Sequence, residues 1–320
     1  MRPTVPCVRT LVLICTFLSL SFSSFSQSIT TGNGKYEFGA GIGPMYFLGD
    51  LGGHTGEGTA FLKDLNMPLI KLSKGIYANV FPAEWIGFRL AANHGVVEGY
   101  DSIIQDKGGA ERFRKDRNLS FRSSVLEVYA GAEIYPTVFV ERYDGLLGKL
   151  RPYGVIGVGA FKFNPKTNYG GKMIDLNPLR LEGQGMAEYA DRKEYSKISY
   201  EIPMGMGAKY YIKENMYIGM EVLHRKTFTD YIDDVSTTYI NPDLFDKYLA
   251  PQQAAIAKQL HYRELSAQTR TPTGIDGEQR GDPRQNDSFF STLIKFGFRL
   301  NDWNSPSGRA SRQLRCPSFY

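Results

Sequence analysis

Hydrophobic and polar residues alternate with a period of two along most of the chain beyond residue 35. Segments of about 10 to 15 residues with this alternation are separated by polar, Gly-rich or Pro-bearing stretches. Because the side chains of a β-strand point to opposite faces in turn, the alternation predicts strands with two unlike faces. Eight strands are predicted, over residues 36–48, 69–80, 85–96, 121–136, 152–163, 198–212, 216–228 and 289–300.

Seven of these strands combine an apolar face with a face of glycine and charged residues, while the segment 152–163 is apolar on both faces and has no preferred orientation. In the first strand, for example, Phe38 and Ile42 lie opposite Glu37 and Gly39. A soluble barrel buries its apolar face, whereas an outer-membrane barrel turns that face to lipid. Small residues and charges of both signs suit a narrow lumen. The pattern therefore predicts an all-β fold, an eight-stranded antiparallel transmembrane β-barrel, with a soluble β-sandwich as the alternative.

Charged residues on the polar faces are predicted to neutralise one another inside the barrel. The predicted lumen network consists of Glu37, Lys71, Arg89, Glu127, Glu133, Glu201, Lys209, Glu221, Arg225, Lys295 and Arg299.

The connections between the predicted strands alternate between long and short, as in barrels with tight periplasmic turns and long extracellular loops. The long loops are residues 49–68, 97–119, 164–197 and 229–288, and both termini fall on the side of the short turns. Apolar spacings over residues 242–268 predict a helix of about five turns in the last loop. Whether this helix only covers the barrel mouth or binds a partner is left open by the sequence.

Aromatic residues near the strand ends are predicted to form girdles at the two membrane interfaces. These residues are Tyr36, Tyr46, Trp85, Tyr135, Tyr153, Phe163, Tyr211, Phe228 and Phe289.

The N-terminus has the pattern of a secretory signal peptide. Arg2 and Arg9 precede an apolar run over residues 11–20, and Ser24 and Ser26 stand at the −3 and −1 positions of a cut before residue 27. The predicted parts are the signal peptide 1–26, the outer-membrane barrel 27–300 and a periplasmic tail 301–320. Cleavage would leave Cys316 as the one cysteine of the three in the chain.

Composition and charge narrow the choice of function. The chain has 38 Lys+Arg and 33 Asp+Glu, a net charge of +5, which is too mild and too dispersed for a nucleic-acid-binding surface. Its 34 glycines and 13% aromatic residues favour β-structure with close backbone packing. We therefore expect no nucleic-acid partner.

Candidate catalytic and metal-binding residues are few. The four histidines, His54, His94, His224 and His261, show no metal-ligand spacing. Ser123 or Ser199 together with His94 or His224 would be the candidates for a hydrolytic site, but a histidine at the rim of a barrel is ordinary, and the structural interpretation is favoured. Asp230, Asp233 and Asp234 lack the glycine of a calcium loop and are predicted to form a solvated acidic turn. No catalytic residue, cofactor or metal is expected.

Several stretches resemble the PorG-type outer-membrane barrels of the type IX secretion system of Bacteroidetes. They are residues 36–53, which contain the turn Gly49-Asp50-Leu51, residues 228–237 (FTDYIDDVST), Gln279-Arg280-Gly281-Asp282 with Asn286-Asp287, and residues 315–319 (RCPSF). Ser288 stands where an aromatic residue would be expected after Asp287, which is a departure from the family pattern.

The resemblance implies a non-catalytic barrel that anchors a ring-forming periplasmic lipoprotein (PorK) and its partner (PorN) at the outer membrane. Such a protein serves protein secretion and, in gliding species, adhesin delivery. Two alternatives come from other classes: an eight-stranded adhesion or structural barrel acting through its extracellular loops, and a lipid-modifying barrel enzyme.

The C-terminal tail is the predicted contact with a periplasmic partner. The tail contains three arginines and one acidic residue: Arg309, Arg312 and Arg315 against Asp302. This excess of positive charge would attract an acidic surface of a partner. Cys316 is predicted either to form an intermolecular disulfide with that partner or to remain a free thiol.

Overall fold

The computed structural model describes residues 36–51, 70–83, 85–104, 111–139, 150–213, 215–263 and 276–300. Eight long strands make up most of this part of the chain. They are β1 (Tyr36–Leu48), β2 (Lys71–Ala83), β3 (Ile86–Tyr100), β4 (Ser120–Ile134), β5 (Leu150–Lys162), β8 (Ile198–Lys213), β9 (Met216–Thr227) and β10 (Ser288–Leu300). The predicted signal peptide and tail lie outside the described residues.

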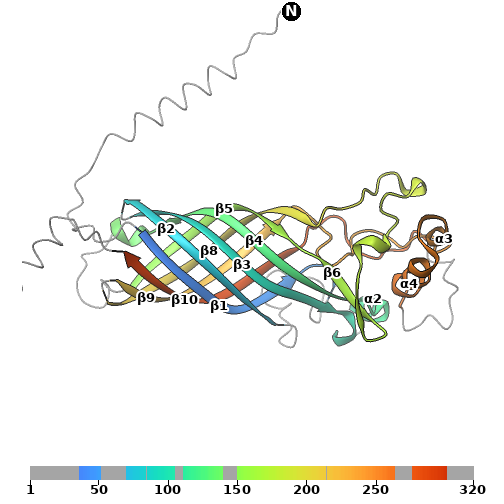
Figure 1. Cartoon of the computed structure of the whole chain (residues 1–320), viewed down its shortest axis with the longest axis horizontal. Helices are drawn as coiled ribbons and strands as arrows, with labels where there is room; N and C mark the ends of the chain where they lie inside the picture. Colours follow the sequence, from blue (N-terminus) through green and yellow to red (C-terminus); the bar gives the residue numbers. More distant parts are fainter. Residues whose placement is uncertain are drawn as a thin grey trace, which may run out of the picture. The chain divides into compact units, whose positions relative to one another are not determined.

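The eight strands close into an antiparallel barrel. Neighbours in sequence pair along β1 to β5 and β8 to β10, β5 pairs with β8, and β1 pairs with β10. The additional pairing of β3 with β4 completes the ring. Figure 1 shows the tilted strands as one tube. The predicted fold class, an all-β eight-stranded antiparallel barrel, is confirmed.

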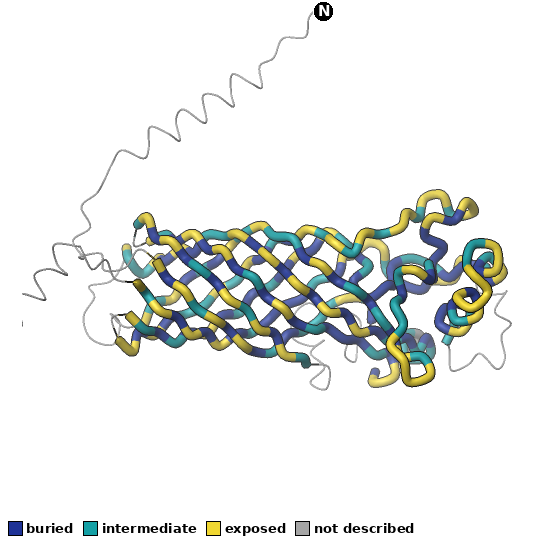
Figure 2. The backbone as a smooth tube through the Cα atoms, in the orientation of Figure 1, coloured by how far each residue is buried: buried dark blue, intermediate teal, exposed yellow. Residues whose placement is uncertain are grey.

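The register determines which side chains face outward. Cross-strand partners have the same parity, as in Tyr36 opposite Leu300 and Ile156 opposite Met204, except at register shifts near the short turns, where Ala83 pairs with Ile86 and Lys213 with Met216. Apart from these shifts, even-numbered residues face outward and odd-numbered ones face the lumen. The exposed fractions agree: Val158 is 68% exposed and Met206 71%, whereas Glu37 and Lys209 are 0% exposed. Figure 2 shows this alternation along the strands that face the viewer.

The outer face of the barrel is apolar and suits lipid rather than water. The large exposed apolar side chains include Phe38, Ile76, Leu90, Val128, Ile156, Met206, Met220 and Phe296. An apolar band of this extent is found on membrane-spanning barrels and not on soluble monomers. The structure also orients β5, which has two apolar faces in the sequence, with Tyr153, Val155 and Phe161 inward.

Inward glycines make room for aromatic rings that cross the lumen. A Cβ at Gly39 would overlap the hydroxyl of Tyr77, and a Cβ at Gly297 would overlap the ring of Tyr217. The glycine-rich face predicted from the sequence is thus a packing requirement of a narrow barrel.

Folded elements gather at the end of the barrel where the long loops lie (Figure 1). The third loop forms the hairpin β6 (Pro165–Tyr169) and β7 (Lys172–Asp175). Gly170 and Gly171 join these strands with φ of 59° and 83°, the left-handed values that a two-residue hairpin turn needs. The same end carries η3 (Asp101–Ile103), α2 (Glu111–Arg117), η5 (Asn177–Leu179), η6 (Ala187–Tyr189), α3 (Leu244–Tyr248) and α4 (Pro251–His261), and η4 (Pro136–Phe139) follows β4.

The single helix predicted over residues 242–268 is wrong in its extent. The structure has two helices, α3 and α4, separated at Leu249 and Ala250. Pro251 disfavours a helical conformation of the residue before it, and Ala250 is extended with ψ of 149°. Residues 264–268 lie outside the described ranges. Within these ranges, no helix is long and apolar enough to cross a membrane.

The predicted aromatic girdles are also partly wrong. Tyr36 is exposed on the outer face of β1, and Trp85 and Phe228, which lie just beyond the ends of their strands, are exposed as well. Five others point inward and are buried, because they occupy odd-numbered positions. These five are Tyr135, Tyr153, Phe163, Tyr211 and Phe289.

A charge on the apolar band should destabilise the barrel. Phe296 is 52% exposed on the outer face of β10, between Ala40 and Ile218 of the neighbouring strands. We expect Phe296→Arg to cost about 2–4 kcal/mol of folding free energy in a bilayer. The folded fraction, measured by heat-modifiable migration on unboiled gels across a urea series, checks this value. Phe296→Leu is the control and should remain within about 1.5 kcal/mol of the wild type; equal behaviour of the two variants would contradict a lipid-facing position.

Candidate functional site: the lumen network and the extracellular cap

A network of ion pairs crosses the lumen in the half of the barrel near the short turns. Lys209 Nζ lies 2.6 Å from Glu37 Oε2 and 2.9 Å from Glu133 Oε2. Arg89 pairs with Glu133 and lies 2.6 Å from Glu221 Oε2. The side chains come from strands on different sides of the barrel, so these contacts join the walls across the lumen.

Further cations and tyrosine hydroxyl groups also bind the carboxylates of these glutamates. Arg299 Nη2 lies 2.7 Å from Glu37, and Lys295 Nζ lies 3.0 Å from Glu221. Inward tyrosines donate hydrogen bonds to the same carboxylates: Tyr211 to Glu37 at 2.9 Å, Tyr153 to Glu221 at 2.7 Å, and Tyr135 to Glu133. Buried charges are tolerated when they are paired and hydrogen-bonded in this way.

A second, smaller cluster lies nearer the extracellular end. Arg225 donates to Glu127 at 3.0 and 2.6 Å and to Ser291 Oγ at 2.5 Å, and Asn93 also donates to Glu127. Glu201 is 1% exposed, and its carboxylate accepts no hydrogen bond from the residues that the structure describes.

The structure thus brings together most of the predicted lumen charges. Seven of them form the first network, Arg225 and Glu127 form the second cluster, and Glu201 is buried in the lumen beside Glu127. Lys71 differs, because it pairs with Glu98 at 3.0 Å and keeps a side chain that is 35% exposed. The sequence reasoning missed the tyrosines, although Tyr77, Tyr129 and Tyr217 stand at inward positions on the same faces.

The packed side chains seal the lumen. Arg89, Lys209 and Lys295 are at most 2% exposed, and Lys295 Nζ lies 3.8 Å from the centre of the Tyr77 ring. The interior of an eight-stranded barrel is just wide enough for side chains. The middle of this barrel is therefore a solid core rather than a channel.

The extracellular loops form a folded unit, which we call the cap (residues 163–197, 229–263 and 276–287), and its core is continuous with apolar residues at the extracellular end of the barrel such as Phe121 and Phe161. Its buried apolar residues come from the third and fourth loops: Phe163, Leu176, Leu179, Leu181, Met186, Ile232, Val235, Ile240, Phe245, Ala254, Ala257 and Leu260. Loops that merely connect strands do not need such a core.

Arg117 ties three loops together at the base of the cap. Its guanidinium lies 2.8 Å from Asp101 Oδ2 and donates to the carbonyl of Asp50 at 2.6 Å and to that of Arg280. Asp101 also accepts the N–H of Leu119 at 3.1 Å. The first, second and fourth long loops meet at this arginine.

Arg280 and Glu182 join the third loop to the fourth. They pair at 2.8 Å and are almost completely buried. Glu182 also accepts the N–H groups of Ser236 at 2.9 Å and Thr237 at 3.0 Å. Arg280 in turn donates to the carbonyl of Asp234 at 2.6 Å.

Two aspartates of the fourth loop accept hydrogen bonds from backbone N–H groups of nearby residues. Asp233 accepts the N–H groups of Leu51 at 3.1 Å and Val235 at 3.0 Å. Asp287 accepts the N–H of Ile232 at 2.8 Å. The acidic turn at residues 230–234 is therefore not solvated as predicted, because Asp230, Asp233 and Asp234 are all buried.

These contacts bring together most of the segments that carry the family resemblance. The turn at Asp50-Leu51, residues 228–237, residues 279–282 and Asp287 are consecutive partners in one network, which is closed by the N–H of Asp282 on Asp50 Oδ2 at 2.7 Å. In this structure these motifs have a structural role, which is to hold the cap on the barrel.

Burial raises the pKa values of the carboxyl groups in this network. The pKa of Asp230 is raised to about 8 and that of Asp234 to about 7, in both cases chiefly through loss of hydration. The pKa values of Asp233 and Asp287 are well above the usual range for the same reason, and each is raised further by the other acids nearby.

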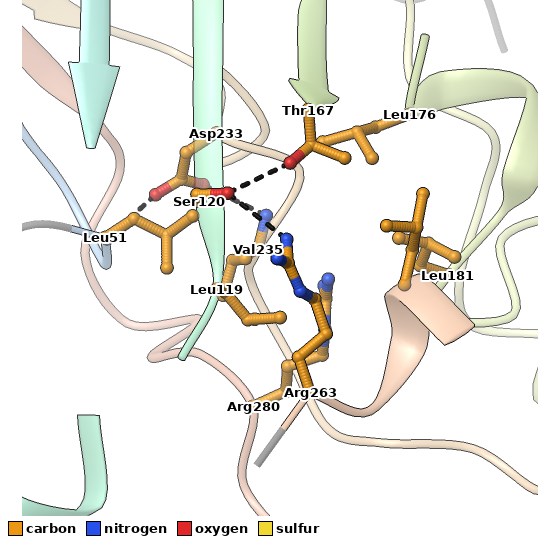
Figure 3. A pocket seen from close by; sticks show the side chains of 11 residues that line it. Leu51, Leu119, Ser120, Thr167, Leu176, Leu181, Asp233, Val235, Arg263 and Arg280 are labelled. Atoms are coloured by element: carbon orange, nitrogen blue, oxygen red, sulfur yellow. Dashed lines mark hydrogen bonds between the residues drawn. The ribbon is translucent and has the colours of Figure 1, made fainter. Parts of the chain in front are cut away.

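A small cavity lies between the cap and the barrel rim (Figure 3). Its volume of about 10 Å³ is close to the space of one water molecule. Ser120 and Thr167 are hydrogen-bonded at 3.0 Å on its wall, and Arg263 donates to Ser120 at 3.3 Å. The cavity is too small for a substrate.

The histidines and serines do not form the considered hydrolytic site. Ser123 faces inward and accepts the N–H of Asn164 at 3.1 Å, whereas His94 faces outward and contacts Ser124 Oγ at 3.0 Å. His261 is buried in the cap, where it accepts the N–H of Ile240, and burial lowers its pKa to about 3. Among the described residues no three His, Cys, Asp or Glu side chains are arranged to hold a metal ion.

The predicted partner-binding residues of the tail, Arg309, Arg312, Arg315 and Cys316, lie outside the described residues, as does His54.

No protein-family model matches the sequence, and no curated protein matches it significantly. Solved structures with similar architecture include Neisserial surface protein A (8% identity, TM-score 0.37, covering 84% of this chain and 99% of that one). Ail, the attachment invasion locus protein of Yersinia pestis, is 9% identical with a TM-score of 0.36 and coverages of 84% and 99%. Outer membrane protein W of E. coli is 16% identical with a TM-score of 0.33 and coverages of 84% and 100%.

These likenesses are too distant to support an argument about function. The chain's own geometry defines its class: a closed barrel of eight strands with a lipid-facing apolar band is an outer-membrane β-barrel protein.

Removing one carboxylate from the lumen network should be costly. Glu133→Gln keeps the shape of the side chain but removes the negative charge that faces both Arg89 and Lys209. We expect a loss of about 3–5 kcal/mol, because Arg89 and Lys209 each lose one of two counter-charges and the buried network is left with excess positive charge. Urea titration of the folded band on unboiled gels measures this loss. Glu201→Gln is the matched control and should be neutral or stabilising, so a greater loss for Glu201→Gln than for Glu133→Gln would contradict the account.

The cap should loosen as the pH rises. When folding raises the pKa of an aspartate, its protonated form stabilises the folded state. This stabilisation is complete below the pKa of the unfolded chain, near 3.9, and is lost as the pH rises through the pKa of the folded protein. Since the pKa of Asp230 is raised to about 8, amide hydrogen exchange over residues 228–240, corrected for intrinsic rates, should be slower at pH 6.5 than at pH 9. Asp230→Asn should weaken this dependence, and the exposed Asp191→Asn should not change it. Equal pH dependence in the wild type and Asp230→Asn would refute the effect.

Proposed function

We propose that this outer-membrane barrel is a membrane anchor that acts by binding a macromolecular partner on its extracellular cap. The observation that carries the proposal is the combination of a sealed lumen with a folded cap. The lumen network leaves no path for a solute, and the cap has buried ion pairs and a hydrophobic core that continues into the extracellular end of the barrel. A protein of this kind works through contact and not through transport.

The exposed surface of the cap is polar. On α4, Ala254, Ala257 and Leu260 are buried in the cap, while Gln252 and Gln253 are exposed. Around it, Lys247 pairs with Glu188 at 2.6 Å and Lys258 pairs with Asp246 at 2.6 Å. A surface of amides and balanced ion pairs favours a polar partner, such as a surface carbohydrate or a hydrophilic protein face, over an apolar one.

A second candidate function is a role in type IX secretion, in which the barrel anchors a PorK/PorN-like periplasmic assembly. The observation that favours it is that most of the segments resembling the PorG-type family contact one another in a single hydrogen-bond network. The resemblance therefore covers one structural unit and not only separate short stretches. In this candidate the contact would be made on the periplasmic side, through Arg309, Arg312 and Arg315, with Cys316 either paired to the partner or free.

Substitutions on opposite sides of the membrane distinguish the two candidates. A strain that lacks the protein is complemented with the wild type, with the cap variant Gln252→Arg/Gln253→Arg/Ala255→Arg, or with a chain that ends at Asp302. The cap variant alters exposed positions only, so folding should be kept and is checked by heat-modifiable migration. If the cap binds the partner, the cap variant loses at least about tenfold in cell-surface binding while the truncated chain does not.

The opposite result supports the secretion candidate. Two results together would overturn the proposal that the cap binds a partner. The first is accumulation of secreted proteins in the periplasm of cells with the truncated chain, and the second is normal surface binding by cells with the cap variant. Non-reducing gels of the wild type and Cys316→Ser then report whether the tail forms an intermolecular disulfide.

A further inference from the structure

The outer face of the barrel has an uneven charge distribution that the cap and the lumen do not explain. Over the eight strands, the even-numbered positions carry a single acidic residue, Glu98, which is only 5% exposed. Outward basic residues lie near the extracellular ends of their strands, and Lys213, at the register shift at the other end of β8, is exposed as well. Those at the extracellular end are Lys74, His94, Arg122, Lys162, His224 and Lys226.

Four of these residues form a contiguous patch on β2 to β5, which we call the basic patch: Lys74, His94, Arg122 and Lys162. Lys74 is the direct cross-strand partner of His94, and His94 and Lys162 both flank Leu126 on β4. With strands about 4.8 Å apart, this row spans about 14 Å. Arg122 lies on the same face of β4, two residues beyond Ser124, whose hydroxyl contacts His94 Nε2 at 3.0 Å.

The patch has an excess of positive charge. Arg122 shares Glu98 with Lys71, at 3.3 and 3.0 Å, so one acid faces two cations there. Lys74 and Lys162 make no hydrogen bond or ion pair with any residue that the structure describes. Both lysines are exposed on the side of the barrel that faces the membrane, where an unneutralised ammonium group is costly unless it reaches an anion or the interface.

The surface directly below the patch is apolar. Toward the middle of the membrane the same strands expose Ile76 (66%), Leu90 (59%), Val128 (51%) and Val158 (68%). A ligand seated here meets hydrocarbon-like side chains at one end and several cations at the other. This arrangement matches a lipid with acyl chains and a phosphorylated headgroup, because lysine binds phosphate as a point charge and arginine binds it through a planar fork.

We propose that the basic patch binds the phosphate groups of a lipid in the outer leaflet, with the lipid's acyl chains lying on the apolar surface below. Lys74 and Lys162 supply the free cations at the two ends of the row, and Arg122 contributes at its upper edge. The bound lipid neutralises this side of the barrel, which the protein itself leaves positive. The inference depends on the barrel and its orientation in the membrane, not on what the cap binds.

Binding of a diphosphorylated lipid A probe to the full-length detergent-solubilised protein tests the proposal. Each lysine near a membrane surface strengthens binding to anionic lipid several-fold, so Lys74→Gln/Lys162→Gln should weaken binding by roughly ten- to thirtyfold. Lys74→Arg/Lys162→Arg should retain it. The matched control Lys193→Gln/Lys213→Gln removes two exposed lysines elsewhere and should leave the affinity within about twofold.

Three results would overturn the proposal. The first is unchanged affinity in the Lys74→Gln/Lys162→Gln variant, and the second is an equal loss in the Lys193→Gln/Lys213→Gln control. The third is displacement of the lipid A probe by inorganic phosphate, added at the same concentration as the phosphate groups of the probe. This result would show that the patch binds a free anion rather than a lipid. Heat-modifiable migration of every variant shows that the barrel is folded, so a failure of the proposal is distinguishable from a failure of the fold.

Discussion

A charge inside a narrow barrel must be neutralised and hydrogen-bonded by its neighbours, and the rest of this structure depends on that constraint. Glu37, Glu133 and Glu221 each contact at least one cation and one tyrosine hydroxyl in the lumen. The network requires glycines where rings cross the lumen and a fixed register between strands. A shift by one residue would expose these charges to lipid and bury the apolar band.

The same principle operates above the membrane with different partners. The buried charges of the cap and of its base include Arg117, Arg280 and Glu182. Their hydrogen-bond partners are mainly backbone groups of the loops, whereas the charges in the barrel lumen mostly contact other side chains. Backbone groups of irregular loops need such partners when they are buried. The cap can therefore be an ordered extension of the barrel, and we expect its order to depend on pH because burial raises the pKa values of its acids.

The sequence was sufficient to predict the barrel, because alternation with a period of two reports directly which face of a strand is apolar. It also identified most of the inward charges, but not their partners: Lys209 on β8 meets Glu37 on β1 and Glu133 on β4, and such contacts depend on strand tilt across the lumen. The cap was largely missed, since loop packing has no periodic signal. One local signal was present and overlooked, the Gly170-Gly171 turn of the hairpin β6–β7.

The central claim is that the barrel is a sealed anchor rather than a channel. Single-channel recording of the purified chain in planar lipid bilayers tests it most directly. The account predicts insertion without a stable conductance step, because Arg89, Lys209 and Lys295 fill the lumen together with the inward tyrosines. Reproducible open-channel steps from the folded, heat-modifiable protein would contradict it.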